Sequence, residues 1–82
     1  MEGSDNIVLG SYNQGYGDAN VICGCSNALQ GNLNTVGGDC NAIDGDCNTL
    51  TGDSNACIGD ANLISGDGNF VSGSNNIVMG LD

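Results

Sequence analysis

Residues 38–50 read GDCNAIDGDCNTL, and the tetrad Gly-Asp-Cys-Asn occurs twice in this stretch, beginning at Gly38 and again at Gly45. The seven-residue spacing has two interpretations. The thiols and carboxylates could form a site that does chemistry, or the Gly and Asn could belong to a repeating frame in which Cys and Asp fill variable positions. The remainder of the sequence distinguishes between them.

The seven-residue spacing extends along the whole chain. Gly recurs every seven residues from Gly3 to Gly80 without a break, and Asn follows three residues after each of the first eleven of these glycines. The chain is therefore built from eleven copies of Gly-x-x-Asn-x-φ-x, from Gly3 to Met79, and we expect residues 1–82 to form a single domain. The repeated asparagines are Asn6, Asn13, Asn20, Asn27, Asn34, Asn41, Asn48, Asn55, Asn62, Asn69 and Asn76.

This heptad favours a β-solenoid over a coiled coil, because a coiled coil needs two apolar positions per heptad and residues that form helices well. One inward apolar residue per repeat, with a Gly free to adopt φ > 0, instead predicts a short strand followed by a corner. With two heptads in each 14-residue coil, we expect an all-β solenoid of about five and a half coils, two flat parallel sheets and no helices. The φ position is apolar in every repeat except the second, which has Gly: it holds Val8, Gly15, Ile22, Leu29, Val36, Ile43, Leu50, Cys57, Ile64, Val71 and Val78.

The repeated asparagines are predicted to form ladders inside the coil. Side chains alternate along a strand, so an Asn two positions before the inward φ residue also points inward. Stacked on successive coils, each amide could donate to and accept from the copies above and below it.

The repeat frame resembles that of a known protein family. From GSDNIVLG at residues 3–10 to GSNNIVMG at residues 73–80, the frame is similar to the heptad-repeat β-roll of the perennial ryegrass ice recrystallisation inhibition (antifreeze) proteins, whose repeat is written x-x-Asn-x-Val-x-Gly. The resemblance implies a left-handed β-roll, and it implies binding to ice if the outward residues suit that function.

The charge of the chain excludes several function classes. Ten Asp and Glu, with no Lys, Arg or His, give a formal net charge of −10. Such a chain repels nucleic acid and anionic membranes, so neither is expected as a partner. It also lacks the usual general bases and the cationic groups that activate nucleophiles, so we do not expect an enzyme. The N-terminus MEGSDNIVLG has no signal-peptide pattern, which leaves the cellular location open.

Alternate heptads place their outward residues on two different faces. One face carries no charge, whereas the other is irregular apart from a row of Ala. The uncharged face is suited either to contact with another copy of the chain or to ice, and in the second case it would be centred on Thr35, Thr49 and Thr51. The residues proposed for this face are Ile7, Leu9, Val21, Thr35, Thr49, Thr51, Leu63, Ser65, Ile77 and Met79.

Of these two hypotheses, the sequence favours a non-catalytic structural protein that assembles with other copies of itself. The terminal heptads leave no room for polar capping repeats, and the odd number of heptads lets a second chain continue the Gly, Asn and φ rows after a half turn. Such a head-to-tail contact does not close on itself, and it predicts a filament. Binding to an ice crystal surface is the alternative.

Two clusters of polar residues are weak candidates for metal binding. Asp39, Asp53 and Asp67 should stack on consecutive coils, where Ca²⁺ would relieve their mutual repulsion, although we favour the simpler hypothesis that each Asp accepts a hydrogen bond within its own turn. Cys23, Cys25 and Cys40 should lie near one corner, as half of a soft-metal site or with Cys25 and Cys40 in a disulfide. Neither cluster has a recognised metal-binding motif, so no cofactor is expected.

Overall fold

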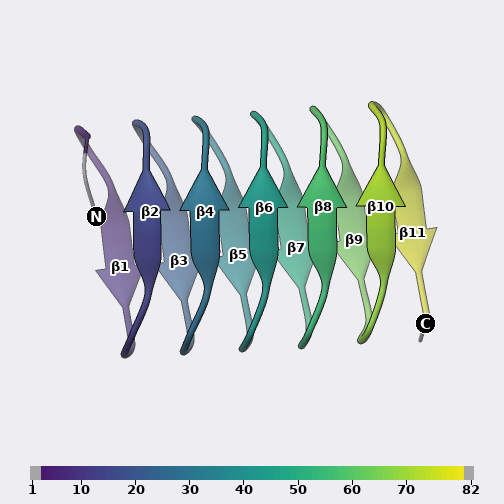
Figure 1. Cartoon of the computed structure of the whole chain (residues 1–82), viewed down its shortest axis with the longest axis horizontal. Helices are drawn as coiled ribbons and strands as arrows, with labels where there is room; N and C mark the ends of the chain where they lie inside the picture. The colour runs from purple at the N-terminus through teal and green to yellow at the C-terminus, as the bar shows by residue number, and fades with distance from the viewer. Residues whose placement is uncertain (1–2, 81–82) are drawn as a thin grey trace.

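The computed structural model describes residues 3–80, which form a parallel β-solenoid (Figure 1). Its regular elements are eleven three-residue strands, one in each heptad. They are β1 (Ile7–Leu9), β2 (Gln14–Tyr16), β3 (Val21–Cys23), β4 (Ala28–Gln30), β5 (Thr35–Gly37), β6 (Ala42–Asp44), β7 (Thr49–Thr51), β8 (Ala56–Ile58), β9 (Leu63–Ser65), β10 (Phe70–Ser72) and β11 (Ile77–Met79).

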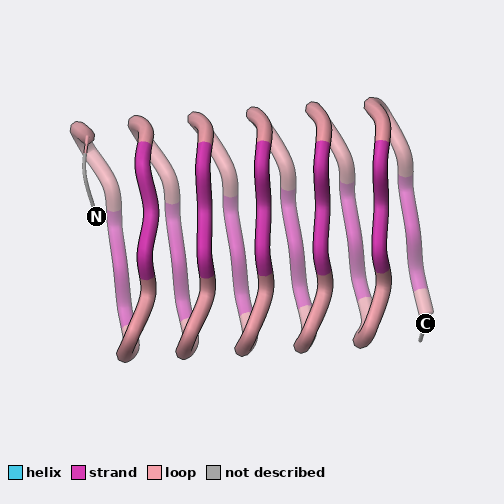
Figure 2. The backbone as a smooth tube through the Cα atoms, viewed as in Figure 1, coloured by secondary structure: helices cyan, strands magenta, loops and turns pink. Residues whose placement is uncertain are grey.

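The strands alternate between two parallel sheets. Six strands form the order β1-β3-β5-β7-β9-β11, and five form the order β10-β8-β6-β4-β2. Each residue aligns with the residue fourteen positions along the chain, as Thr35 does with Thr49. Figure 2 shows the turns at the two ends of the strands. The prediction of two heptads per coil and two sheets is therefore confirmed, and the described residues contain no helix, hence none that could cross a bilayer.

The core is a single row of side chains between the two sheets. The middle residue of each strand points inward, and eight of these residues form one buried cluster, namely Ile22, Leu29, Val36, Ile43, Leu50, Cys57, Ile64 and Val71. Val8 and Val78 pack against it at the two ends of the stack, and Gly15 is buried without a side chain to contribute. The inward φ position predicted from the heptad is thus confirmed.

The asparagine side chains join each coil to its neighbours. Asn48, which is fully buried, donates through Nδ2 to the carbonyl of Gly59 at 2.8 Å, and its Oδ1 accepts the backbone N–H of Asn62 at 2.9 Å. The same two bonds recur along both edges of the stack. The predicted ladders exist, but their main partners are backbone groups of the adjacent coil. Direct amide-to-amide contact, such as Asn48 Nδ2 to Asn34 Oδ1 at 3.2 Å, is secondary.

The corners depend on two positive-φ residues in each repeat. Gly38 has φ 121°, and a Cβ placed there would lie 1.9 Å from the carbonyl oxygen of Gly52, so no other residue fits that position. Two residues further on, Cys40 has φ 60°, and Cys47 has the same value in the next repeat. The sequence did not predict this left-handed position, because the residues that occupy it are chemically unrelated and few of them favour that conformation.

We expect Asn48→Ala to destabilise the protein by about 2–4 kcal/mol, because it leaves a partly buried carbonyl and a buried N–H without partners. Chemical denaturation monitored by circular dichroism measures the change. The matched control is Asn32→Ala, which removes an exposed acceptor that lies 2.8 Å from the Asp18 backbone nitrogen and is expected to cost about 0.5–1 kcal/mol. Equal losses for the two variants would contradict the importance of the buried ladder.

Candidate functional site

The outward side chains of the six-stranded sheet form two straight rows. The register of the parallel strands fixes the alignment, since each strand contributes its first and third residues to this face. The first row is Ile7, Val21, Thr35, Thr49, Leu63 and Ile77; the second row is Leu9, Cys23, Gly37, Thr51, Ser65 and Met79. We call these twelve residues the six-stranded face. The structure places all ten residues that the sequence proposed for this face on it, and none of the twelve is charged.

The middle of the six-stranded face differs from its ends. Val21, Thr35 and Thr49 follow one another in the first row, and all three are β-branched, which restricts χ1 and holds their methyl groups in defined positions. At the end strand β11, which has a neighbour on one side only, Ile77 and Met79 are 71% and 75% exposed. The regular part of the face is therefore its centre.

The strands under this face run side by side in nearly the same direction (Figures 1 and 2). Parallel strands lie about 4.8 Å apart, and a sheet stays flat over many strands only where stacking or side-chain ladders oppose the usual twist. The buried Asn ladders provide such a restraint at both ends of every strand, as the bonds of Asn48 and Asn55 to the next coil illustrate. The outward groups accordingly repeat at a constant spacing.

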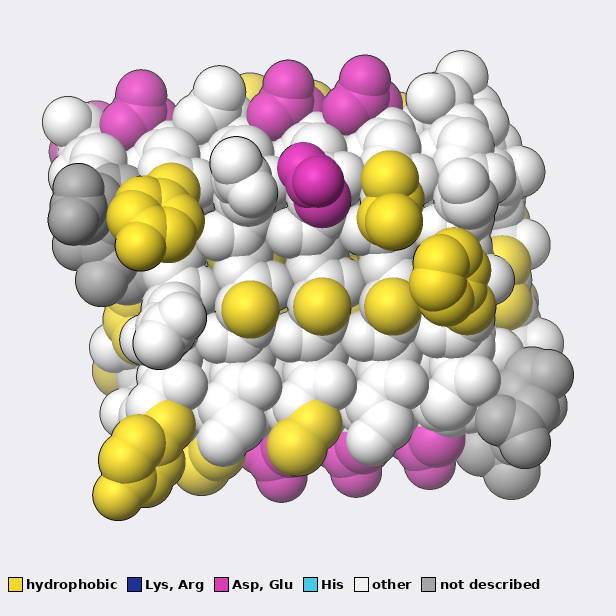
Figure 3. All heavy atoms as spheres, in the orientation of Figure 1, with side chains coloured by type: hydrophobic (Ala, Val, Ile, Leu, Met, Phe, Trp, Pro, Cys, Tyr) yellow, Lys and Arg dark blue, Asp and Glu magenta, His cyan; other side chains and the backbone are white. Residues whose placement is uncertain are grey.

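The outer face of the five-stranded sheet is uneven by comparison. Ala28, Ala42 and Ala56 align in one row, and the neighbouring row contains the carboxylate of Asp44. The space-filling view of this face shows a line of small hydrophobic side chains between bulkier groups, with acidic side chains along both edges (Figure 3). A charged group and side chains of unequal height make this face a poor match to a regular, neutral surface.

The aspartates of the turns bind the backbone of the preceding coil. Asp53 Oδ1 accepts the N–H of Asp39 at 2.9 Å, and Asp67 Oδ1 accepts the N–H of Asp53 at 2.9 Å. Asp46 and Asp60 make equivalent bonds at the opposite edge. Our expectation that each Asp accepts a hydrogen bond within its own turn was therefore wrong, because the second position of the heptad directs its side chain along the stack.

The three cysteines proposed as a soft-metal site have neighbouring backbones but do not form a site. The N–H of Cys40 donates to the carbonyl of Cys25 at 3.0 Å, and Gly38 donates to the carbonyl of Cys23 at 2.9 Å. All three thiols are exposed and free, with no disulfide between Cys25 and Cys40. Within residues 3–80, no group of three or more Cys, Asp or Glu side chains is arranged to hold a metal ion, and this includes the row of Asp39, Asp53 and Asp67.

Cys57 differs from the other four cysteines because it lies in the core. It is 1% exposed, and its thiol donates to Asn48 Oδ1 over 3.5 Å. Burial raises the pKa of the Cys57 thiol above its ordinary value of 9.0, and a hydrogen bond with the Asn62 side chain opposes part of this shift. Cys57 is therefore a small core residue rather than a reactive one.

This shift predicts a loss of stability at alkaline pH. Because the folded state holds the thiol proton more tightly than the unfolded state, the contribution of Cys57 is present below pH 9.0 and is lost as the pH rises above it towards the folded pKa. We expect Cys57→Val to reduce the decline of unfolding free energy above about pH 9. Urea denaturation at several pH values in this range measures the unfolding free energy. The control is Cys47→Ser, which removes an exposed thiol. An unchanged pH dependence in Cys57→Val would contradict the assignment.

The geometry defines a class of protein: a parallel β-solenoid, braced by Asn ladders, that presents a flat and uncharged sheet face. The family model described as grass antifreeze beta roll matches residues 1–80. The chain therefore belongs to the grass antifreeze β-roll family, as its repeat frame had suggested. A search of curated protein sequences found no match. The family is an ice-binding one and not an enzyme family.

Proposed function

We propose that this protein binds ice through the six-stranded face and thereby slows ice recrystallisation. The observation that carries the proposal is the uncharged, register-aligned face with Val21, Thr35, Thr49 and Thr51 at its centre. Membership of an antifreeze family supports the function. The choice of face rests on the chemistry and spacing of its side chains.

The physical basis is a match between two rigid surfaces. Ice presents a neutral lattice of water whose positions are fixed, so a protein surface gains from it only where its own groups repeat and are held still. β-Branched Val and Thr supply methyl groups in restricted rotamers, and Thr adds a hydroxyl that both donates and accepts. A carboxylate would keep its own strongly oriented hydration shell, and removing that shell is costly. The six-stranded face has no such group.

Thr49 lies at the centre of the face and provides the direct test. Thr49→Lys places a hydrated cation among the aligned methyl groups, and we expect the protein concentration needed to inhibit recrystallisation to rise by at least about tenfold, or roughly 1.4 kcal/mol in binding. The measurement is the growth rate of ice grains in an annealed frozen film.

The matched control is Ala42→Lys, which adds the same charge at the equivalent strand position of the five-stranded sheet. It should leave inhibition close to that of the unmodified chain. If Ala42→Lys abolishes inhibition and Thr49→Lys does not, the proposed face is the wrong one. Ice grains that coarsen normally with the unmodified chain would overturn the ice-binding function itself.

Gly37 provides a test in which inhibition of recrystallisation is expected to become stronger. It lies beside Thr51 in the second row, its φ is not positive, and a Cβ built there meets no atom within 4 Å. Gly37→Thr would complete a square of Thr side chains with Thr35, Thr49 and Thr51. We expect this variant to inhibit recrystallisation at a lower concentration and to be more stable by about 0.5–1 kcal/mol, because Gly weakens a strand interior. Weaker inhibition by a folded Gly37→Thr variant would count against a contact centred on these residues.

Head-to-tail assembly of the chain into a filament stays a prediction. Within residues 3–80, β1, β2, β10 and β11 are edge strands with one neighbour each, which is the geometry that strand addition requires. The family match, however, supports ice binding and gives no support to assembly. Ice binding is therefore the function that the combined observations favour.

A further inference from the structure

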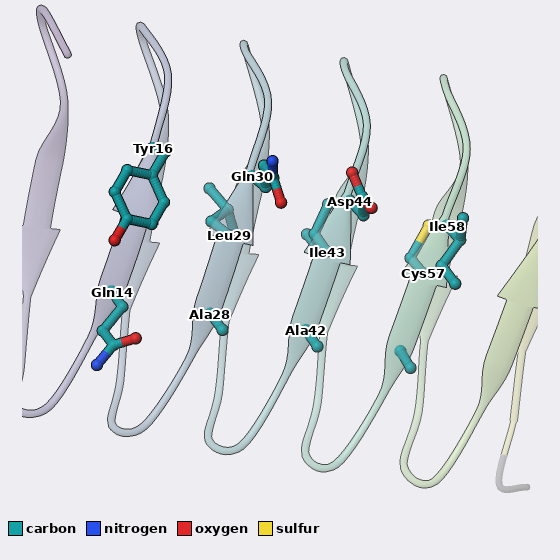
Figure 4. Close-up of a pocket in the computed structure, with 11 residues that line it drawn as sticks. Gln14, Tyr16, Ala28, Leu29, Gln30, Ala42, Ile43, Asp44, Cys57 and Ile58 are labelled. Carbon is teal, nitrogen blue, oxygen red and sulfur yellow. The ribbon is translucent and has the colours of Figure 1, made fainter. Parts of the chain in front are cut away.

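A shallow groove runs along the solenoid axis on the face opposite the proposed ice-binding surface (Figure 4). It crosses β2, β4, β6 and β8 and has a volume of about 330 Å³. We call it the alanine groove. It is lined by outward residues of these four strands, among them Ala28, Ala42, Ala56 and Asp44, and by the buried residues beneath them.

The shape of the groove follows from the unequal side chains of the two outward rows. Ala28, Ala42 and Ala56 form a low apolar step, and the buried residues beneath contribute the floor. The next row forms a taller wall, in which Tyr16 is 57% and Ile58 is 49% exposed. Figure 4 shows Gln30 and Asp44 on this wall between them. With four strands about 4.8 Å apart, the groove is about 14 Å long, which suits an extended rather than a globular ligand.

The charge of the groove and of the surrounding chain determines the sign of the charge that a ligand must carry. The Asp44 carboxylate lies in the wall of the groove. The chain has ten acidic residues and no Lys, Arg or His, so no basic side chain of its own neutralises the carboxylate of Asp44. The potential over the groove is therefore negative, and it attracts cations to an apolar floor.

We propose that the alanine groove binds linear aliphatic polyamines. Such molecules are extended cations whose methylene segments can lie on the alanine step while an ammonium group pairs with Asp44. The amides of Gln14 and Gln30 accept hydrogen bonds from the remaining ammonium protons. Because most of the attraction is between exposed charges, binding is modest in strength and weakens with added salt.

The test is a titration of the 82-residue chain, labelled with ¹⁵N, with spermidine at low and at high ionic strength. We expect saturable shifts of the backbone amide signals of Ala28, Ala42 and Ala56 at low salt, with little effect on the signals of Thr35, Thr49 and Thr51. A neutral linear disaccharide such as cellobiose should produce no saturable shift. Saturable binding of cellobiose without binding of spermidine would overturn the polyamine assignment.

Three variants distinguish specific binding in the alanine groove from a general attraction of cations to an acidic protein. Asp44→Asn should weaken spermidine binding by roughly threefold to fivefold, and Gln30→Glu should strengthen it by a similar factor, as expected for one added or removed charge contact. Asp46→Asn is the matched control: it removes the same charge from a turn, and Asn keeps the acceptor for the Asn32 N–H, as Asn32 itself does for Asp18. It should bind spermidine nearly as the unmodified chain does.

A second measurement separates the apolar contact from the charge. Ala42→Leu fills the middle of the alanine step without changing the charge, and it should abolish the saturable shifts while the circular dichroism spectrum stays unchanged. If Asp44→Asn and Asp46→Asn weaken binding equally, or if Ala42→Leu has no effect, spermidine associates only with the overall negative field and the proposal is wrong. Because the groove and the six-stranded face lie on opposite sheets, neither result depends on the outcome of the ice experiments.

Discussion

The buried asparagine amide is the interaction on which this structure depends. One side chain satisfies a carbonyl and an N–H of the same repeat in the next coil, as Asn48 does for Gly59 and Asn62. The apolar core is one residue wide in each strand, so it cannot by itself offset the loss of conformational entropy on folding. Hydrogen bonds between coils, made by backbone and amide together, supply much of the remaining stability.

The same hydrogen bonds also hold the outward residues of both sheets in regular positions. The ladders fix the separation and direction of successive strands, so any residue placed at the first or third strand position repeats at a constant spacing. The frame leaves these outward positions free to vary. One sheet consequently presents Val21, Thr35 and Thr49 in a neutral row, while the other presents an alanine step next to Asp44. Two surfaces of different chemistry thus rest on a single repeated scaffold.

Most of the fold was predictable because the heptad repeat has no breaks. The spacing of Gly and Asn predicted the strands, the inward φ residues and the ladders, and the structure confirmed all three. The role of the turn aspartates was not predictable, since periodicity gives the neighbours of Asp53 but not the direction in which its side chain points. The left-handed conformation of Cys40 and Cys47 was hidden for a related reason: the third position holds residues of many types, so composition gave no signal.

The sequence by itself determined the solenoid, its two faces and the absence of charge from one of them, because a period of seven with one inward residue leaves a single arrangement of inside and outside. It also separated Cys40 from Cys47, the pair in the opening tetrads, by sending consecutive heptads to opposite corners. Only the tertiary structure decided what the polar groups bind and where the surface is hollow. Hydrogen-bond partners such as Asp39 N–H and Asp53 Oδ1, and the groove beside Asp44, arise from contacts between coils fourteen residues apart, and these depend on the heights and directions of side chains rather than on their spacing in sequence.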